Sequence, residues 1–273
     1  IAVVLMACAA GIVSVVVGWI PVVATLERRT VDWRMRYREA DLEYGKDIVI
    51  VLIDDAALHK FPYRSPVPRD MLANLIRIVH ASGAKLIGVD VFLKDLSWDE
   101  YDADLVNTMQ KSGRVVIVSA FRKEGGRNKG FHVDLPHPKF LETALATSLV
   151  ELPVDPVDGI ARHYQTFFRI EDNALPTLAT TLYLLDHGIE TPEYKFLTRQ
   201  SLEEIWPAGV ALDSSGRFYI NYQAPPFKTG SASNPLKVFP ASVILTGMLP
   251  AEWFENTIVL IGAGFTDSKD DLP

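Results

Sequence analysis

The sequence predicts an α/β fold in which a mostly parallel central sheet carries flanking helices and antiparallel additions, preceded by one transmembrane helix. Two observations predict the sheet: the apolar runs at 46–53, 84–93 and 114–120 are typical of strands covered on both faces, and helical patterns separate them. A third observation, a charge-free run at the start of the chain, predicts the membrane segment.

Residues 1–24 contain no charged side chain and are long enough to cross a bilayer, which takes roughly 20 apolar residues in a helix. A signal peptide is the alternative interpretation, but its apolar core usually spans only about 7–15 residues. We therefore expect a transmembrane helix at 1–24. Because the chain begins with Ile1 rather than Met, we also expect it to be part of a longer protein.

Residues 25–45 form a charged segment in which arginines are interleaved with acidic residues. The apolar residues of this segment are only roughly amphipathic at helical spacing. A solvated juxtamembrane helix is one interpretation, and a connector that transmits movement to the membrane helix is the other. The candidate signal-coupling residues are Asp32, Arg34 and Arg36. We expect the remainder, 46–273, to form one α/β domain.

Composition limits the classes of function. Apolar residues make up 48% of the chain and charged residues 22%, which is ordinary for a folded domain. The formal net charge of −7 and the pI near 5.4 argue against a nucleic-acid partner, because phosphate binding needs a surplus of Lys and Arg. The single cysteine, Cys8, lies in the apolar run, so no disulfide or thiolate metal site is expected in the folded part.

The first half of the domain alternates strands and helices. After the strand at 46–53, Pro68 and Gly83 bracket a helix, and an apolar stripe runs along it. The strand at 84–93 follows, and a right-handed crossover makes the two strands parallel. A helix at 101–111 leads to the strand at 114–120, and we expect another helix at 139–148.

In the second half of the domain, the regular alternation of strands and helices gives way to turns, short strands and short helices. A turn at 155–159 precedes the segment 161–170, and a helix is expected at 176–187. A strand at 217–222, a short proline-started helix at 239–247 and a buried strand at 257–263 complete the domain. The middle third should therefore supply the antiparallel additions.

Charged residues follow the predicted strands, at the edge where open parallel sheets usually bind ligands. The ligand-binding candidates are Asp54, Asp55, Arg69, Asp90 and Asp267. The carboxylates could cap turns or helices, bind a ligand or an ion, or act in acid–base catalysis. We favour capping and turn roles, and expect Arg69 to face Asp54 across the start of the helix in a structural ion pair.

Motifs for catalysis or cofactor binding are missing from the sequence. Neither glycine-rich phosphate loop occurs, and His132 and His137 stand in a proline-containing loop rather than at metal-ligand spacing. Asp54 and Asp55 are adjacent, whereas an aspartyl-nucleophile phosphatase would have two aspartates separated by one residue. We therefore assign no catalytic residue, metal or cofactor to this segment.

Six segments of the chain, taken in order, resemble the CHASE type 2 sensor domain. They are IVLIDDAAL at 50–58, PVPRD at 66–70, GAKLIGVDVFL at 83–93, DPVDGIARHY at 155–164, FYINYQ at 218–223 and IVLIGAGFTDSKDDLP at 258–273. The preceding apolar run and the stretch with Asp32, Arg34 and Arg36 are also similar to that family. The resemblance covers about 26–273.

The resemblance implies an extracytoplasmic input domain of a bacterial membrane receptor, located at the inner membrane on its periplasmic or extracellular side. It implies a homodimer that perceives a small-molecule or physical signal and regulates a cytoplasmic output. That output would be a class III nucleotide cyclase, using Mg²⁺ or Mn²⁺ with ATP or GTP, or else a histidine or serine/threonine kinase. Two alternatives remain open: a membrane-tethered metal-dependent hydrolase using Asp54, Asp90 and Asp267, and a purely structural dimerisation module.

Overall fold

The computed structural model describes residues 21–36, 45–123, 131–170, 173–189, 212–213, 215–222 and 236–265. The chain divides into two compact units. One contains the helix α2 (Pro21–Arg36), and the other contains every strand that the structure describes. Most of the expected transmembrane segment, 1–20, lies outside the described residues. Within the described ranges, no helix combines the length and apolar character needed to cross a bilayer.

Helix α2 contains the expected connector from residue 25 up to Arg36, and its described residues also include 21–24 of the charge-free run. Leu26 and Trp33 are both more than half exposed. The part of the predicted connector beyond Arg36, up to residue 44, lies outside the described residues.

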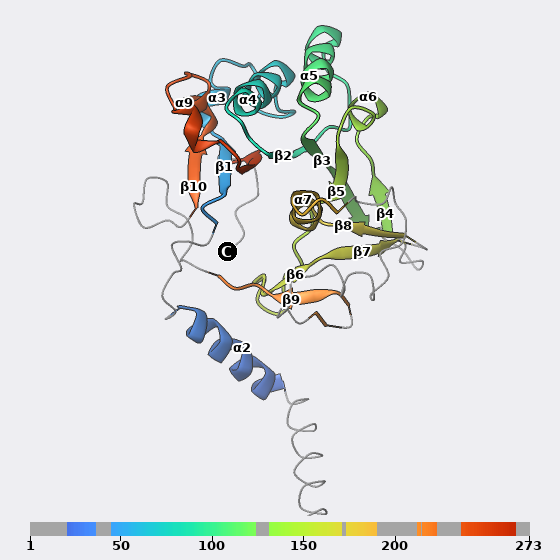
Figure 1. Ribbon diagram of the computed structural model, residues 1–273. Coiled ribbons are helices and arrows are strands. Elements are labelled where there is room, and N and C mark those ends of the chain that lie inside the picture. Colours follow the sequence, from blue (N-terminus) through green and yellow to red (C-terminus); the bar gives the residue numbers. More distant parts are fainter. Residues whose placement is uncertain are drawn as a thin grey trace, which may run out of the picture. The chain divides into compact units, whose positions relative to one another are not determined.

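The larger unit is built on a sheet with the strand order β10-β1-β11-β2-β3-β4, and β5 also pairs with β3 (Figure 1). All pairings are parallel except that between β3 and β4, so the predicted mostly parallel α/β fold is confirmed. The strands are β1 (Ile48–Ile53), β2 (Leu86–Phe92), β3 (Val115–Lys123), β4 (Phe131–Asp134), β5 (Ala146–Leu149), β10 (Lys237–Pro240) and β11 (Ile258–Ala263).

The strands β1 and β2 are parallel, as predicted, but they are not neighbours. The last strand of the chain, β11, lies between them and pairs with both, with Leu260 opposite Ile50 on one side and Gly88 on the other. β11 is therefore a central strand, and both rows of its backbone hydrogen bonds are used inside the sheet. This position matches its apolar sequence, since a central parallel strand is covered on both faces.

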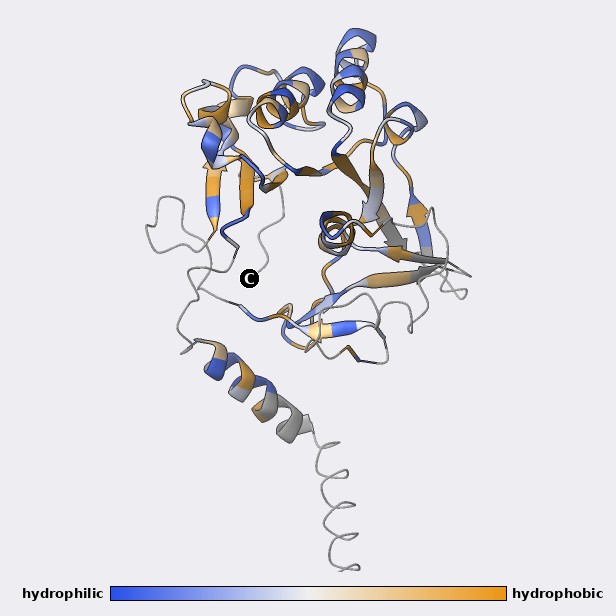
Figure 2. Cartoon of the chain, in the orientation of Figure 1, coloured by the Kyte–Doolittle hydropathy of each residue, from blue (hydrophilic) through white to orange (hydrophobic). Residues whose placement is uncertain are grey.

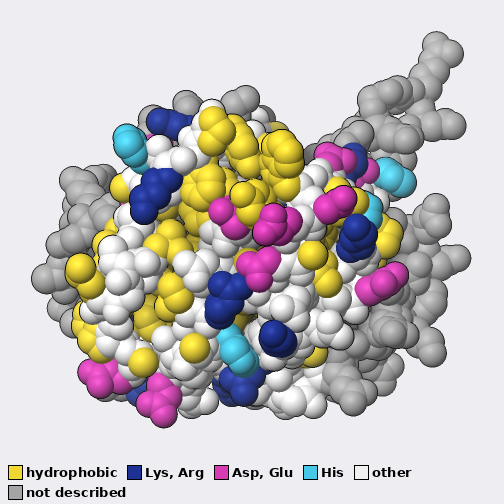
Figure 3. Space-filling view, turned by 90° about the horizontal axis from the view of Figure 1, so that it is seen from above, with side chains coloured by type: hydrophobic (Ala, Val, Ile, Leu, Met, Phe, Trp, Pro, Cys, Tyr) yellow, Lys and Arg dark blue, Asp and Glu magenta, His cyan; other side chains and the backbone are white. Residues whose placement is uncertain are grey.

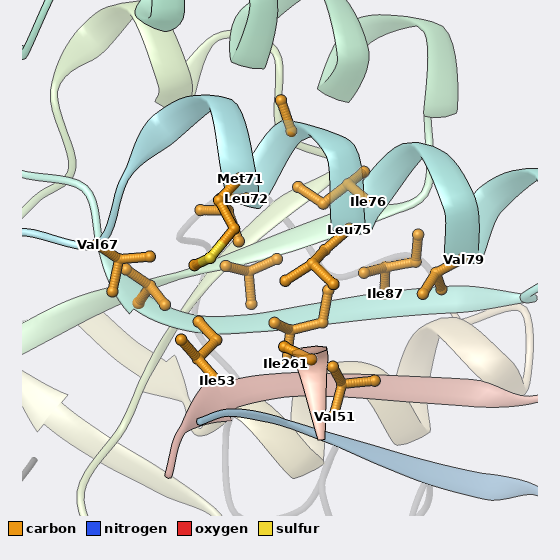
Figure 4. Close-up of a cluster of buried hydrophobic side chains, with 14 of the residues drawn as sticks. Val51, Ile53, Val67, Met71, Leu72, Leu75, Ile76, Val79, Ile87 and Ile261 are labelled. Atoms are coloured by element: carbon orange, nitrogen blue, oxygen red, sulfur yellow. The ribbon is translucent and has the colours of Figure 1, made fainter. Parts of the chain in front are cut away.

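One face of the sheet is covered by the helices α4 (Arg69–Ala81) and α5 (Asp99–Ser112), which pack against each other. The predicted stripe of α4, namely Leu72, Leu75, Ile76 and Val79, is fully buried against the strands. Figure 4 shows these side chains above Val51, Ile87 and Ile261 of three neighbouring strands. Figure 2 shows the matching hydropathy pattern, with apolar strands and mixed helices.

The other face is covered in part by α7 (Leu178–Asp186), which contacts β2, β3 and β5. Leu182 of this helix packs with Leu86 and Val116 of the sheet. Gly88 allows this approach: a Cβ atom there would lie 2.9 Å from Leu260 Cδ2 and 3.0 Å from Leu182 Cδ1. The missing side chain therefore sets how closely α7 packs on the sheet.

Of the four strands that form the two antiparallel pairs, three come from the middle third, as predicted, and the fourth, at 217–219, lies in the last third. β6 (His163–Gln165) pairs with β9 (Arg217–Tyr219), and β7 (Phe167–Ile170) pairs with β8 (Asn173–Pro176). Each pair is a separate two-stranded sheet rather than an extension of the main one.

Two expectations were wrong in part. The predicted helix at 139–148 is a single helical turn, α6 (Pro138–Leu141), followed by the strand β5. The short helix α9 (Ala241–Ile244) was predicted, but the strand β10 just before it was not. Both strands have only four residues, too few for an apolar period to distinguish strand from helix. The short helices α3 (Asp55–Leu58) and η1 (Ala251–Trp253) complete the unit.

Candidate functional site

The candidate site lies at the carboxyl ends of the parallel strands, in the connection from β1 to α4. This connection, residues 54–68, contains α3 and ends where the buried side chain of Arg69 begins α4. The connection from β2 to α5 lies beside it, because Arg69 reaches the backbone of both connections. Figure 3 shows apolar, acidic and basic side chains side by side on the face over α3, α4 and α5.

Asp54 caps a helix that is remote in the sequence. Its carboxylate accepts a hydrogen bond from the Ser242 backbone N–H at 2.9 Å and another from the Ser242 hydroxyl at 2.6 Å. Ser242 is the second residue of α9, so Asp54 satisfies an N-terminal amide of that helix. Asp54 therefore has the capping role that we favoured from the sequence, but it caps α9 rather than the next helix in the chain, α3.

Asp55 points to a different partner. Its carboxylate forms an ion pair with Arg64 at 2.6 Å, and both side chains are about half exposed. The segment between them folds around a hollow of ≈ 600 Å³ that is lined by residues 55, 56 and 58–64. Asp54 and Asp55 therefore have different roles: Asp54 caps α9, and Asp55 lines the hollow.

Arg69 is buried, with 3% of its surface exposed, and it faces Asp102 of α5 rather than Asp54. The expectation of a pair with Asp54 was wrong, because the carboxylate of Asp54 is turned toward α9. Arg69 Nε lies 3.8 Å from Asp102 Oδ1, within ion-pair range but too far for a hydrogen bond. Burial lowers the pKa of Arg69, and the charge of Asp102 opposes that shift.

The guanidinium of Arg69 also ties neighbouring segments together. It donates to the carbonyl of Val67 at 3.3 Å and to the carbonyl of Asp95 at 3.2 Å, and it lies over the ring of Phe140 at 5.7 Å. Asp102 accepts in turn from the backbone N–H of Ser97 at 2.6 Å. The pair therefore fixes two connections, at 67–69 and 95–97, to the helix layer.

Asp90 lies within β2 on the opposite face of the sheet from α4. It is exposed between the buried Val89 and Val91, and it is paired in register with Gly262. Asp54 is bonded to Ser242, and Asp267 lies outside the described residues. Among the described residues, no group of three or more His, Cys, Asp or Glu side chains could hold a metal ion. The three-aspartate site of the alternative hydrolase stays a prediction that this geometry does not favour.

The three candidate signal-coupling residues, Asp32, Arg34 and Arg36, all lie on α2. Arg34 Nε donates to the backbone carbonyl of Thr30 in the same helix at 3.3 Å. Both residues are exposed. Their proposed role in coupling stays a prediction.

Arg162 was missed in the sequence. Its side chain is buried, with 7% exposed, and it donates to both carboxylate oxygens of Asp158 at 3.0 and 2.8 Å. Asp155 lies 3.6 Å away from the same guanidinium. The signal was the spacing in DPVDGIAR: two aspartates in a turn, followed by an arginine four residues after the second. This arrangement locks the turn before β6.

A buried polar cluster at the start of α7 was also missed. Thr177 Oγ1 lies 2.6 Å from the hydroxyl of Tyr164, and it donates to the carbonyl of Gln165 at 2.9 Å. Burial raises the pKa of Tyr164, which favours its neutral hydroxyl beside Thr177. The cluster joins α7 to β6.

Comparison with known proteins gives one family. No curated protein and no solved structure matches the chain. The model of the CHASE2 domain matches residues 4–273, which is nearly the whole chain and includes every segment on which the resemblance depended. The chain therefore belongs to the CHASE2 domain family, a family of extracytoplasmic sensory domains.

Proposed function

We propose that this chain is the extracytoplasmic input domain of a membrane receptor that regulates a cytoplasmic output domain. The observation that carries the proposal is the family match over 4–273, which includes most of the charge-free run expected to cross the membrane. The first choice for the output is a class III adenylate or guanylate cyclase, and the second is a histidine or serine/threonine kinase. A cyclase would use Mg²⁺ or Mn²⁺ with ATP or GTP, outside this chain.

Regulation requires two states of the domain that a signal binds or affects differently. Two segments are placed in the sequence to carry such a difference toward the membrane: α2, which continues from the charge-free run, and the segment after β11. A homodimer would let both copies move their membrane segments together. The signal itself is a small molecule or a physical stimulus.

The location of the domain can be tested with a single cysteine. Val157 is 70% exposed in the turn before β6, so a Cys8→Ser, Val157→Cys chain would present one reactive thiol on the domain surface. A membrane-impermeant maleimide should label this thiol in cells whose outer barrier has been opened but whose inner membrane is intact. Labelling only after lysis would place the domain in the cytoplasm and overturn the proposal. The Cys8→Ser chain serves as the blank.

Control of an output can be tested in a fusion of the chain to a class III cyclase catalytic domain through a membrane segment. The Arg34→Ala, Arg36→Ala double variant should change cyclic-nucleotide production, basal or stimulated. A matched double variant, Arg77→Ala with Arg114→Ala, removes the same charge from the other unit. Equal production in wild type and both variants would remove the connector role.

A further inference from the structure

The hollow formed by residues 55–64 has the size and lining of a small-molecule site. Its volume of ≈ 600 Å³ lies within the range of about 300–1,000 Å³ that is usual for ligand pockets. It opens at the carboxyl edge of the parallel sheet, where ligands of open α/β folds bind. Two of its lining residues, Leu58 and Phe61, pack on the main hydrophobic core.

The charged groups of the hollow favour an anion. The basic side chains of His59, Lys60 and Arg64 line the hollow, and Asp55 is the single acid among the lining residues. Lys60 and His59 are exposed at the rim. An arginine fork also matches the geometry of a carboxylate or a phosphate, to which it donates two parallel hydrogen bonds.

The remaining lining favours an organic ligand over a bare ion. Ala56, Leu58, Phe61, Pro62 and Tyr63 supply the apolar and aromatic surface of the hollow. Such a lining gains free energy from the apolar part of a ligand, which a small inorganic anion lacks.

The segment that forms the hollow is held by hydrogen bonds at both of its ends, whereas the ion pair of Asp55 and Arg64 within it is partly exposed. Asp54 is held by Ser242 just before the hollow, and Val67 is held by Arg69 just after it. Between these anchors, Asp55 and Arg64 are 43% and 50% exposed. Because the carboxylate of Asp55 lies against Arg64, a ligand oxyanion at Arg64 would compete with it.

We infer that this hollow is the ligand site of the sensor domain and takes a small organic oxyanion, a molecule with a carboxylate or phosphate group on an apolar body. The inference rests on the proposed input function. The oxyanion exchanges with Asp55 at Arg64, Lys60 adds attraction, and the apolar body lies on Phe61. Asp55 directly follows Asp54, which caps α9. Releasing Asp55 from Arg64 would therefore alter the backbone next to that cap.

The test is calorimetric titration of the intact chain with four probes: benzoate, phenyl phosphate, benzamide and inorganic phosphate. Benzoate or phenyl phosphate should bind, and the one that binds more tightly identifies the preferred oxyanion. Benzamide, which has the same ring without the charge, and inorganic phosphate, which has charge without the ring, should each bind at least about tenfold more weakly. Binding of benzamide as tight as that of benzoate, or no binding of any probe, would overturn the inference.

Variants locate the site with a matched control. Arg77 and Asp104 form an ion pair of the same kind outside the hollow, at 2.8 Å and with 50% and 41% exposure. Arg64→Met should weaken binding of the preferred probe at least about tenfold, whereas Arg77→Met should not change it. Asp55→Asn should strengthen binding several-fold, because it removes a competing carboxylate, and Asp104→Asn should have no effect. Equal effects of the two arginine variants would refute the assignment.

The inference and the proposed function fail in different experiments. If the cysteine label places the domain outside the cytoplasm and the cyclase fusion responds to the connector variants, the input function stands even when no probe binds to the hollow. Thermal unfolding of Arg64→Met and Arg77→Met confirms that both variants are folded before the titration is read.

Discussion

Replacing Arg69 with methionine should destabilise the domain strongly, because it leaves the charge of Asp102 buried without its partner. The side chains of Arg69 and Asp102 are 2% and 1% exposed, and Arg69 Nε and Asp102 Oδ1 lie 3.8 Å apart. With an effective dielectric constant of about 20, two unit charges at 3.8 Å attract each other by about 4 kcal/mol. Breaking a buried pair by removing one partner usually costs about 3–5 kcal/mol, which agrees with this figure.

The measurement is the free energy of unfolding from urea titration of wild type, Arg69→Met and the double variant Arg69→Met, Asp102→Leu. The single variant should lose about 3–5 kcal/mol. The double variant should recover part of this loss, because it no longer buries a lone carboxylate. Recovery should be incomplete, since the Ser97 N–H loses its acceptor, which costs about 1–3 kcal/mol.

The exposed pair of Arg77 and Asp104 is the control, because pairs of this kind contribute only about 0–1 kcal/mol. If Arg69→Met were no more costly than Arg77→Met, the carboxylate of Asp102 would have to be neutral or hydrated in the folded domain. The account of Arg69 as the tie between two connections would then be wrong.

Three further predictions concern other polar contacts. Asp54→Ala should cost about 1–2 kcal/mol of unfolding free energy, because it removes both bonds to Ser242; Asp54→Asn should cost less, since its amide oxygen still accepts one bond. Arg162→Met should cost about 1–3 kcal/mol and increase proteolytic cleavage at 155–162, because it removes the two charge-assisted hydrogen bonds to Asp158, whose side chain is 35% exposed. Burial and the charge of Arg217 lower the pKa of His163, so the unfolded chain binds a proton first as the pH falls. Stability should therefore decrease below the ordinary value of 6.5 until the folded pKa is passed, and His163→Gln should remove that part of the pH profile.

The elements with local signals were predictable from the sequence. The apolar stripe of α4 and the glycine after it located that helix, and Gly113 ends α5 in the left-handed conformation with φ 60°. The position of β11 between β1 and β2 was not predictable in this way. Pairing between 48–53 and 258–263 depends on contacts between segments some 200 residues apart, which no local period reports.

The roles of the candidate residues were likewise predictable where they depended on neighbouring residues, and not where they depended on distant segments. A carboxylate that directly follows a strand indicated a cap, and Asp54 is one, but the identity of its partner depended on where α9 lies in the fold. The face of Asp90 was available from the sequence, because it stands between Val89 and Val91 in a strand whose side chains alternate. The partner of Arg69 was not, since Asp102 belongs to a helix two elements later in the chain.

The energies of these ion pairs indicate where a signal could act on the domain. A ligand can shift an equilibrium only by its differential affinity for two states, typically about 1–3 kcal/mol. Separating Arg69 from Asp102 would consume more than that, whereas the exposed pair of Asp55 and Arg64 costs at most about 1 kcal/mol to exchange. The buried pair should therefore act as a fixed frame, and the exchange proposed above at Asp55 and Arg64 lies within the energy that a weakly binding signal can supply.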